Sequence, residues 1–388
     1  MTVGKNEGYE MIHSDLIAIT KYEVLSKLPD PFTFMDGSKV KTHDDWSRRR
    51  EELFRYVELV YGQQLPKPEI FRVETMGKGS RSHCYRITAG PYECPVSFMM
   101  TIHFPPEKKA KYPVVIDGDL CWDYPFSSDY MNPFLKSGIA VVLFNRLELA
   151  ADVRELGKRS PLYRAYPDHT FGATLAWAWG YSRCVDALME LDLVNPACIA
   201  FTGHSRGGKT AFLAGILDER ATIVNPNESG AGGCGSFKIR MEGVDEVGNS
   251  SGNETLEALL DQFDYWFSPE LKNYYGRAEE LPFDTHQLKA LIAPRILLEG
   301  NAASDLWANS VGSVQTAIAA KEVFKFLGVE ENLLWYFRHG GHWHNAEDIS
   351  RLANLMVGSM ERTKTKDEYF VPTFHLPEKP YDWSAPEV

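Results

Sequence analysis

The residues most suited to chemistry lie in the pentapeptide Gly203–Gly207, which reads Gly-His-Ser-Arg-Gly. This is the G-x-S-x-G pattern of a serine held on a strained turn between a strand and a helix, where glycines avoid steric clashes. We expect Ser205 to be the nucleophile of an acyl transfer, with the backbone N–H of Arg206 facing the developing oxyanion. The alternative is a glycine-rich turn whose serine has no chemical role.

A serine hydroxyl is a weak nucleophile near neutral pH and needs a general base. Where the serine lies on such a turn, the base is a histidine that follows the acid in the chain. The segment Arg338–His344 follows the apolar run Leu333–Phe337 and contains two glycines that let a loop turn. We therefore predict that His342 is the base, with His339 and His344 as alternatives. The cluster could instead bind a metal, but it lacks the carboxylate–histidine spacing of a zinc site, so we expect neither a metal nor a cofactor.

A carboxylate must hold this histidine in the correct tautomer and stabilise the imidazolium. Glu228 and Asp305 each follow a strand-like segment, at Ala221–Val224 and Arg295–Glu299, so both are expected at the carboxyl edge of a parallel sheet, where sites form. Chain topology favours Asp305, because the acid usually follows the later strand. The sequence leaves open that one carboxylate is structural, or that both share the electrostatic work.

These residues can meet only if the fold places the ends of several strands at the same edge of a sheet. From residue 112 onward, short apolar segments typical of buried parallel strands alternate with helical segments. The predicted strands are Val114–Ile116, Ile139–Phe144, Ala197–Thr202, Ala221–Val224, Arg295–Glu299 and Leu333–Phe337. The predicted helices are Gly172–Leu191, Lys209–Leu217, His286–Ile292, Gly312–Leu327 and Asn345–Met360. This alternation predicts the α/β class, with a mainly parallel central sheet in a three-layer αβα sandwich.

The N-terminal part differs from this pattern. Residues 1–70 are expected to form an extension with an amphipathic helix from about Asp44 to Tyr61, and strand-like segments follow near residues 70–87 and 96–104. No linker or repeat divides the chain, so we predict a single catalytic domain over residues 1–388. The Gly- and Asn-rich stretch Glu228–Asn253 receives no structural assignment, and its length suggests function or disorder.

Composition excludes several classes of protein. The chain has 388 residues, of which 44% are hydrophobic and 24% are charged, as in ordinary globular proteins. Its net charge of −12 argues against a nucleic-acid partner, and no apolar run is long enough to cross a membrane. The N-terminus lacks a basic start followed by an apolar segment, so we expect no signal peptide in the chain. The cysteines form no C-x-x-C pair, although Cys84 and Cys94 could bridge a hairpin. The sequence does not indicate an oligomeric state.

The segments around these residues resemble carbohydrate esterase family 15, the glucuronoyl esterases. Gly203–Lys209 reproduces the family pattern G-[HC]-S-R-x-G-K, and Glu228–Gly233 resembles its E/D-S-G-x-G-G block. Trp177–Arg183 resembles its W-A-W-G-x-S-R helix. Further matches occur at Leu28–Pro31, Val60–Gly62, Leu291–Arg295 and Asp305–Trp307. The resemblance covers most of residues 28–350 and implies an α/β-hydrolase fold.

The resemblance implies a serine esterase that cleaves the ester between 4-O-methyl-glucuronic acid on xylan and an alcohol of lignin through an acyl-enzyme. It implies that Ser205 is the nucleophile and His342 the base, with the acid at the position of either Glu228 or Asp305. The implied partner is glucuronoxylan or a lignin–carbohydrate ester. A secreted or cell-surface location follows from the same resemblance.

The resemblance also implies roles in substrate recognition. Arg206 would assist the oxyanion through its side chain, Lys209 would bind hydroxyls of the uronic sugar, and Trp307 would line the sugar pocket. Acidic sugar-binding residues are expected near Glu246 or Glu254, without a firm assignment. As a set, the two cations suit a neutral ester substrate whose intermediate and product are anionic.

Each of these three residues also has a structural interpretation. Lys209 could be a solvated lysine on the first helical turn, and Trp307 could belong to the core. Arg206 could pair with Glu228 or Asp305 for structural reasons alone.

Two other functions compete with the glucuronoyl esterase. An acetylxylan or feruloyl esterase would use the same nucleophile, but hydrolysis of an acetyl group would not need Lys209 and Trp307. A catalytically silent carbohydrate-binding homologue is a second alternative, and the intact Ser205, His342 and both acids argue against it.

Overall fold

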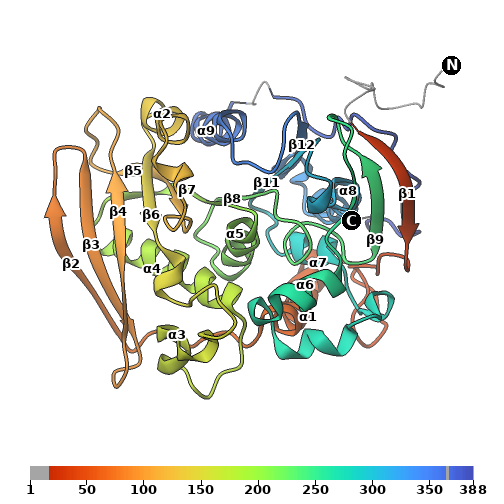
Figure 1. Ribbon diagram of the computed structural model, residues 1–388, viewed down its shortest axis with the longest axis horizontal. Coiled ribbons are helices and arrows are strands. Elements are labelled where there is room, and N and C mark those ends of the chain that lie inside the picture. Colours follow the sequence, from red (N-terminus) through yellow and green to blue (C-terminus); the bar gives the residue numbers. More distant parts are fainter. Residues whose placement is uncertain (1–16, 364–366, 388) are drawn as a thin grey trace.

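A nine-stranded sheet forms the centre of the computed structural model, which describes residues 17–363 and 367–387. The strand order is β12-β11-β8-β7-β5-β6-β4-β3-β2 (Figure 1). The strands are β2 Ile70–Lys78, β3 Ser82–Gly90, β4 Val96–His103, β5 Tyr112–Asp117, β6 Ala140–Phe144, β7 Val194–His204, β8 Ile223–Asn227, β11 Ile296–Ala302 and β12 Leu333–Arg338.

The strands from β12 to β6 are parallel to one another, and β4, β3 and β2 continue the sheet in antiparallel fashion. Every residue of β5, β6 and β8 is buried, because helices cover both faces of a parallel sheet. The predicted mainly parallel sheet is therefore confirmed. The strand-like segments expected near residues 70–87 and 96–104 are the antiparallel extension, which projects at the left of Figure 1.

Helices pack on the two faces of this sheet. Helices α2 and α9 share one apolar core with the sheet, through residues such as Phe134 and Leu352, whereas α4, α5 and α8 contribute Val185, Phe212 and Val323 to the other core. The helices are α1 His43–Tyr61, α2 Ser128–Lys136, α3 Pro161–Ala165, α4 Ala173–Glu190, α5 Arg206–Leu217, α6 Leu256–Phe263, α7 Thr285–Ala290, α8 Ser310–Phe326 and α9 Ala346–Glu361. The result is the predicted three-layer αβα sandwich. Helix α2 was not predicted, and the proline inside it obscures the helical pattern.

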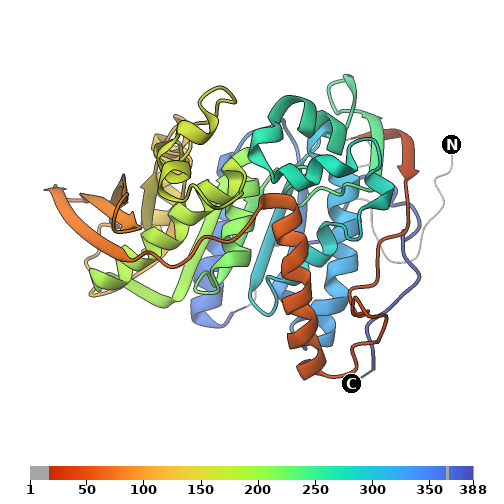
Figure 2. The same cartoon turned by 90° about the horizontal axis from the view of Figure 1, so that it is seen from below.

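The expected N-terminal helix is α1. Thr42 caps it in a capping box with Asp45, which satisfies backbone N–H groups at the helix start. Its apolar side, including Trp46 and Leu53, is buried in the larger core. Figure 2 shows α1 beside α8, where Nε2 of His43 lies 3.0 Å from the carbonyl oxygen of Phe326.

The Gly- and Asn-rich stretch that received no assignment is ordered and largely buried. It contains β9 Ile239–Val244 and β10 Ser250–Gly252, which pair with β1 Ala18–Val24 in a separate three-stranded sheet. This sheet lies at the opposite end of the molecule from β2 (Figure 1). The stretch therefore forms strands, although its many glycines interrupt the sequence pattern by which a strand is predicted.

Three further expectations concern the whole chain. None of the described helices is long and apolar enough to cross a membrane. All of the cysteines lie in the described ranges and carry free thiols, so Cys84 and Cys94 form no bridge. The start of the segment searched for a signal peptide, residues 1–16, lies outside the described residues.

Candidate active site

Ser205 lies on the sharp turn between β7 and α5. Its φ of 57° and ψ of −120° place a residue with a side chain in a strained backbone region. A Cβ on Gly203 would collide with the backbone of Gly207, and a Cβ on Gly207 would collide with the carboxylate of Asp119. The turn therefore requires both glycines of the G-x-S-x-G pattern.

Buried polar groups hold this turn in place. The N–H of His204 donates to Oδ2 of Asp119 at 2.9 Å, and the N–H of Ser205 donates to the carbonyl oxygen of Asn227 at 3.0 Å. Nδ1 of His204 lies 2.8 Å from Oδ1 of Asn227, and the hydroxyl of Tyr124 donates to Oδ2 of Asp119 at 2.6 Å. Such surrounding contacts are what allow a strained residue to persist in a fold.

His342 lies on the loop after β12 and meets both candidate acids beside the nucleophile turn. Its ring centroid is 4.5 Å from that of His204, the residue before Ser205. Nδ1 of His342 is 2.6 Å from Oδ2 of Asp305 and 3.2 Å from Oε2 of Glu228. The His342 side chain is 42% exposed, so a substrate can reach it.

The two alternative histidines have different partners. Nδ1 of His339 is 2.8 Å from Oε2 of Glu246. His344 is buried against the rings of Tyr124 and Tyr130, with centroids 5.6 and 5.8 Å away. Burial lowers the pKa of His344 to about 4, which keeps its ring neutral. Its environment is that of a packed aromatic residue.

The two carboxylates differ in their preferred charge. Burial opposes ionisation of Asp305, but the hydrogen bond and the charge interaction with His342, together with the contacts to Glu228 and His204, outweigh burial and lower the Asp305 pKa. Burial raises the pKa of Glu228 well above its ordinary value, although His342 and Arg338 counteract it. Burial also lowers the pKa of His342, yet its contacts with the two acids prevail and raise it to about 10. The three groups titrate together, with Asp305 as the more readily ionised acid.

The local backbone structure at each acid orients its carboxylate. Asp305 starts the single turn Leu306–Ala308, and its Oδ1 accepts the N–H of Ala308 at 3.3 Å while Oδ2 faces His342. Glu228 follows β8 with a φ of 43°, and its N–H donates to the carbonyl oxygen of Gly300 at 3.1 Å. Both acids thus lie at the carboxyl ends of neighbouring parallel strands, as predicted.

The Arg206 side chain pairs with Asp152, and not with Glu228 or Asp305 as its alternative structural interpretation proposed. Nη1 of Arg206 lies 2.7 Å from Oδ2 of Asp152, and the guanidinium lies 4.8 Å from the ring centroid of Trp266. Asp152 also accepts the indole N–H of Trp266 at 2.7 Å. The carboxylate and the ring face together hold the cation near the start of α5.

Lys209 and Trp307 do not fit their structural interpretations. Nζ of Lys209 is buried, 2.7 Å from Oε2 of Glu254 and 2.6 Å from the carbonyl oxygen of Ser229. Lys209 is therefore half of a buried ion pair and not a solvated lysine. Trp307 is 41% exposed and does not belong to the core, while its carbonyl oxygen accepts the N–H of Glu254 at 2.9 Å.

The end of the Gly- and Asn-rich stretch and the residue directly after it supply two acids to this region. Glu254 follows the stretch, and Glu246 lies within it, with Oε1 accepting the N–H of Gly340 at 2.5 Å and the hydroxyl of Ser304 at 3.0 Å. Glu246 thereby connects the β9–β10 hairpin to the loop that carries His342. The sequence signal was an acidic residue in a glycine-rich segment, which did not distinguish Glu246 from Glu254.

Within the described ranges, one group of side chains has donor atoms close enough to be considered for a metal. The donor atoms of His204, Glu228 and His342 lie within 4.8 Å of one another. Nδ1 of His204 already contacts Asn227, and the carboxylate oxygens of Glu228 contact Arg338 and His342. A cation would have to displace these partners.

The structure brings His342, Asp305 and Glu228 into contact beside the turn that carries Ser205, and it places Arg206 and Lys209 on the helix that follows this turn. The sequence did not identify several supporting residues: Asp119, Asp152, Asn227 and Arg338. Arg338 had one usable signal, because it is the final residue of the last strand and the first residue of the histidine segment. The others gave none, since their partners are distant in the chain.

Known proteins resemble this chain over most of its length. The family model for the glucuronyl esterases of fungi matches residues 87–328. A 4-O-methyl-glucuronoyl methylesterase of Podospora anserina is 32% identical over 349 residues, which cover 87% of this chain and 68% of that protein. A methylesterase of the same name from Cerrena unicolor is 30% identical and is covered to 66% of its length, so the chain spans about two thirds of both relatives.

Among solved structures, a glucuronoyl esterase of carbohydrate esterase family 15 from Caldicellulosiruptor kristjansonii has a TM-score of 0.83 and 29% identity. The match covers 93% of this chain and 98% of that one. The family match includes the positions of Ser205, Glu228 and Asp305 and ends before His342, and the similarities to the relatives cover most of the chain. The chain therefore belongs to the glucuronoyl esterases of carbohydrate esterase family 15, and it is a carboxylic-ester hydrolase.

Proposed function

We propose that this protein hydrolyses esters of glucuronic acid and 4-O-methyl-glucuronic acid, as in lignin–xylan cross-links, through an acyl-enzyme on Ser205. The observation that carries the proposal is the 2.6 Å contact between His342 and Asp305 beside the strained Ser205 turn. A serine activated by a histidine, with a carboxylate behind it, is the arrangement that ester hydrolysis through an acyl-enzyme requires.

In the first half of the reaction, His342 accepts the proton of Ser205 as Oγ forms a bond to the ester carbonyl carbon. Asp305 stabilises the imidazolium that results. The imidazolium then gives its proton to the leaving alcohol oxygen as the original C–O bond breaks, which leaves a glucuronoyl ester on Ser205. In the second half, His342 takes a proton from water as water attacks this ester. Ser205 recovers its proton and the uronate leaves.

Arg206 stabilises the oxyanion in both halves. Its backbone N–H lies at the first position of α5, where helix N–H groups are unpaired and the helix dipole favours negative charge. Its guanidinium adds a permanent positive charge, and Asp152 and Trp266 keep that cation from moving freely. This positive charge favours the anionic intermediate over the neutral ester.

The sugar is recognised by Lys209, Glu254 and Trp307. The buried ammonium–carboxylate pair offers donors and acceptors to hydroxyl groups, and the exposed indole offers an apolar face to a pyranose ring. The substrate class draws support from a serine-to-alanine mutant of the Sporotrichum thermophile glucuronoyl esterase, which was solved with methyl 4-O-methyl-β-D-glucopyranuronate. That structure has a TM-score of 0.68 and 26% identity over 94% of this chain and 93% of that one.

Substrate class and cellular location complete the proposal. The natural partner is glucuronoxylan that carries uronate esters, and a polymer of this kind places the enzyme outside the cell or at its surface. Residues 1–388 act as one catalytic domain, in which the N-terminal extension packs against the αβα sandwich through α1.

A panel of esters tests the proposal. Benzyl glucuronate, methyl 4-O-methyl-glucuronate and 4-nitrophenyl acetate are compared by kcat/KM with the wild-type enzyme and with Ser205→Ala. We expect a strong preference for the uronate esters and loss of all hydrolysis in the variant. Hydrolysis of the acetate without hydrolysis of any uronate ester would contradict the proposed substrate class.

A further inference from the structure

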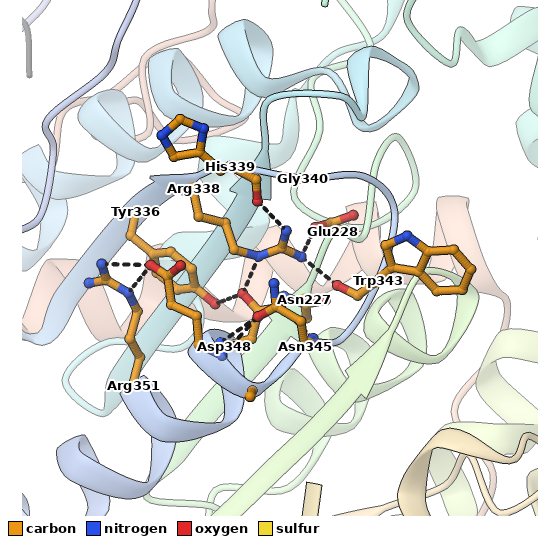
Figure 3. A network of polar contacts seen from close by, with 12 residues as sticks. Asn227, Glu228, Tyr336, Arg338, His339, Gly340, Trp343, Asn345, Asp348 and Arg351 are labelled. Atoms are coloured by element: carbon orange, nitrogen blue, oxygen red, sulfur yellow. Dashed lines mark hydrogen bonds and ion pairs between the residues drawn. The ribbon is translucent and has the colours of Figure 1, made fainter. Parts of the chain in front are cut away.

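Arg338, the last residue of β12, lies at the centre of a network of polar contacts that includes Glu228 and Asp348 (Figure 3). Its side chain is 1% exposed. Nε donates to Oδ1 of Asp348 at 2.7 Å, and Nη2 donates to Oε1 of Glu228 at 2.5 Å. The other N–H groups donate to the backbone carbonyl oxygens of His339 at 2.9 Å, Gly341 at 3.4 Å and Trp343 at 2.5 Å.

Two of these carbonyl groups belong to the residues on either side of His342. The loop therefore curves around one planar cation, with the indole of Trp343 pointing away from it (Figure 3). The same plane binds Glu228, whose other oxygen lies 3.2 Å from Nδ1 of His342. One side chain thus determines both the backbone position of the base and the direction of the second carboxylate.

We propose that Arg338 is a positioning residue for the reaction, which fixes the loop that carries His342 and aims Glu228 at Nδ1 of His342. This inference rests on the proposed function, because it assumes that His342 is the base. Arg338 acts through these two residues and does not touch the reacting atoms.

Asp348 anchors the arginine to the rest of the fold. Its Oδ1 accepts both Nε–H of Arg338 and the hydroxyl of Tyr336, at 2.7 Å each. Its Oδ2 accepts the N–H of Asn345 at 3.0 Å and so ties the network to the start of α9. The loop is therefore held against a long helix, and its geometry does not depend on contacts within the loop alone.

A lysine cannot replace this arginine. A guanidinium presents five N–H groups in a rigid plane, and all of them have acceptors here, whereas an ammonium has three donors around one point. The variant Arg338→Lys keeps the charge and removes the planar fork. It therefore separates the effect of positioning from the effect of charge.

The test measures Arg338→Lys against the wild-type enzyme with benzyl glucuronate, with active serines counted by a fluorophosphonate probe. We expect kcat per active serine to fall about 10²-fold, the size of effect that a small misplacement of a catalytic group produces. KM should change little, because the described contacts of Arg338 do not include Lys209, Glu254 or Trp307. The proton NMR signal of His342 Nδ1–H should also move.

Arg351→Lys is the matched control. Arg351 lies over the ring of Tyr336, 4.8 Å from its centroid, and pairs with Glu347 at 3.0 Å, so the same substitution is made on the solvent side of the same network. Its kcat should equal that of the wild type.

Asp348→Asn is the second test variant. It weakens the anchor of Arg338 without removing the arginine, so kcat should also fall, by a smaller factor than in Arg338→Lys.

A purely structural role predicts a different result. Folded Arg338→Lys or Asp348→Asn with wild-type kcat per active serine and only a lower melting temperature would overturn the inference. If the wild-type serine reacts with the probe but no uronate ester is hydrolysed, the proposed substrate fails, and the rate of probe labelling then tests Arg338. If the wild-type serine does not react at all, the nucleophile assignment and this inference fail together.

Discussion

Nδ1 of His342 lies 2.6 Å from Oδ2 of Asp305, and this contact is shorter than the one that the same nitrogen makes with Glu228. One imidazole nitrogen therefore faces two carboxylates. Among the described contacts, the Asp305 carboxylate pairs with no cationic group other than His342. The Glu228 carboxylate also accepts a hydrogen bond from the guanidinium of Arg338. We propose that Asp305 is the main acid of the triad and that Glu228 is a supporting acid.

The first prediction separates the two acids by mutation. Asp305→Asn should reduce kcat by several orders of magnitude, less than the roughly 10⁴-fold loss known for a triad without a second carboxylate, because Glu228 remains beside the imidazole. Glu228→Gln should reduce kcat by a markedly smaller factor, and the double variant should reduce kcat more than either single variant does. The measurement is kcat on benzyl glucuronate, and a larger loss for Glu228→Gln than for Asp305→Asn would reverse the assignment.

The second prediction concerns pH. A nearby carboxylate favours the imidazolium and so raises the pKa of His342, which stands at about 10 with both acids present. Because His342 must be neutral to act as a base, activity rises as pH increases through this pKa. Glu228→Gln removes one carboxylate, so the acid limb of the kcat/KM profile should move to lower pH. An unchanged or upward-shifted acid limb would show that Glu228 does not act on His342.

A third prediction addresses recognition of the sugar. Trp307 is 41% exposed, so Trp307→Ala should leave the fold intact while it removes an apolar face from the proposed sugar site. We expect kcat/KM for uronate esters to fall and hydrolysis of 4-nitrophenyl acetate to stay nearly constant. Equal losses on both substrates would indicate a general role of the tryptophan in the site. Trp343→Ala, on the exposed side of the His342 loop, is the comparison variant.

A fourth prediction concerns stability. Lys209→Met leaves the Glu254 carboxylate buried without its cation, which should lower the free energy of unfolding by about 3–5 kcal/mol. Adding Glu254→Gln to this variant should recover part of the loss, because it removes the uncompensated charge. Chemical denaturation of the three proteins measures the effect. A Lys209→Met protein as stable as the wild type would mean that the pair is not energetically coupled.

The frame of this site could be predicted from the chain because its signals are local. The apolar strand before Ser205 and the glycines around it identify the nucleophile turn, and the strand-to-loop boundaries before Glu228 and Asp305 place both acids at one sheet edge. The helix α1 and the parallel strands follow from the same kind of pattern. Local sequence patterns are therefore sufficient to predict the order of the helices and strands and the candidate residues of the triad.

The partners of the charged side chains could not be predicted in this way. Arg206 pairs with Asp152 and Lys209 with Glu254, and each partner lies far away in the sequence. Which carboxylate meets a given cation depends on how loops cross the sheet edge, and a single sequence contains no period or spacing that reports it. The same applies to Arg338, whose acceptors are mostly backbone carbonyl groups.

The most direct test of the central claim is to trap the acyl-enzyme. The enzyme is mixed with benzyl glucuronate, quenched in acid on the millisecond timescale, digested and analysed by mass spectrometry, with Ser205→Ala as the control. We predict a peptide that contains Ser205 and carries one glucuronoyl group, formed at a rate consistent with turnover and missing from the variant. Hydrolysis of the ester at the normal rate by Ser205→Ala, or a glucuronoyl group on another residue, would contradict the account.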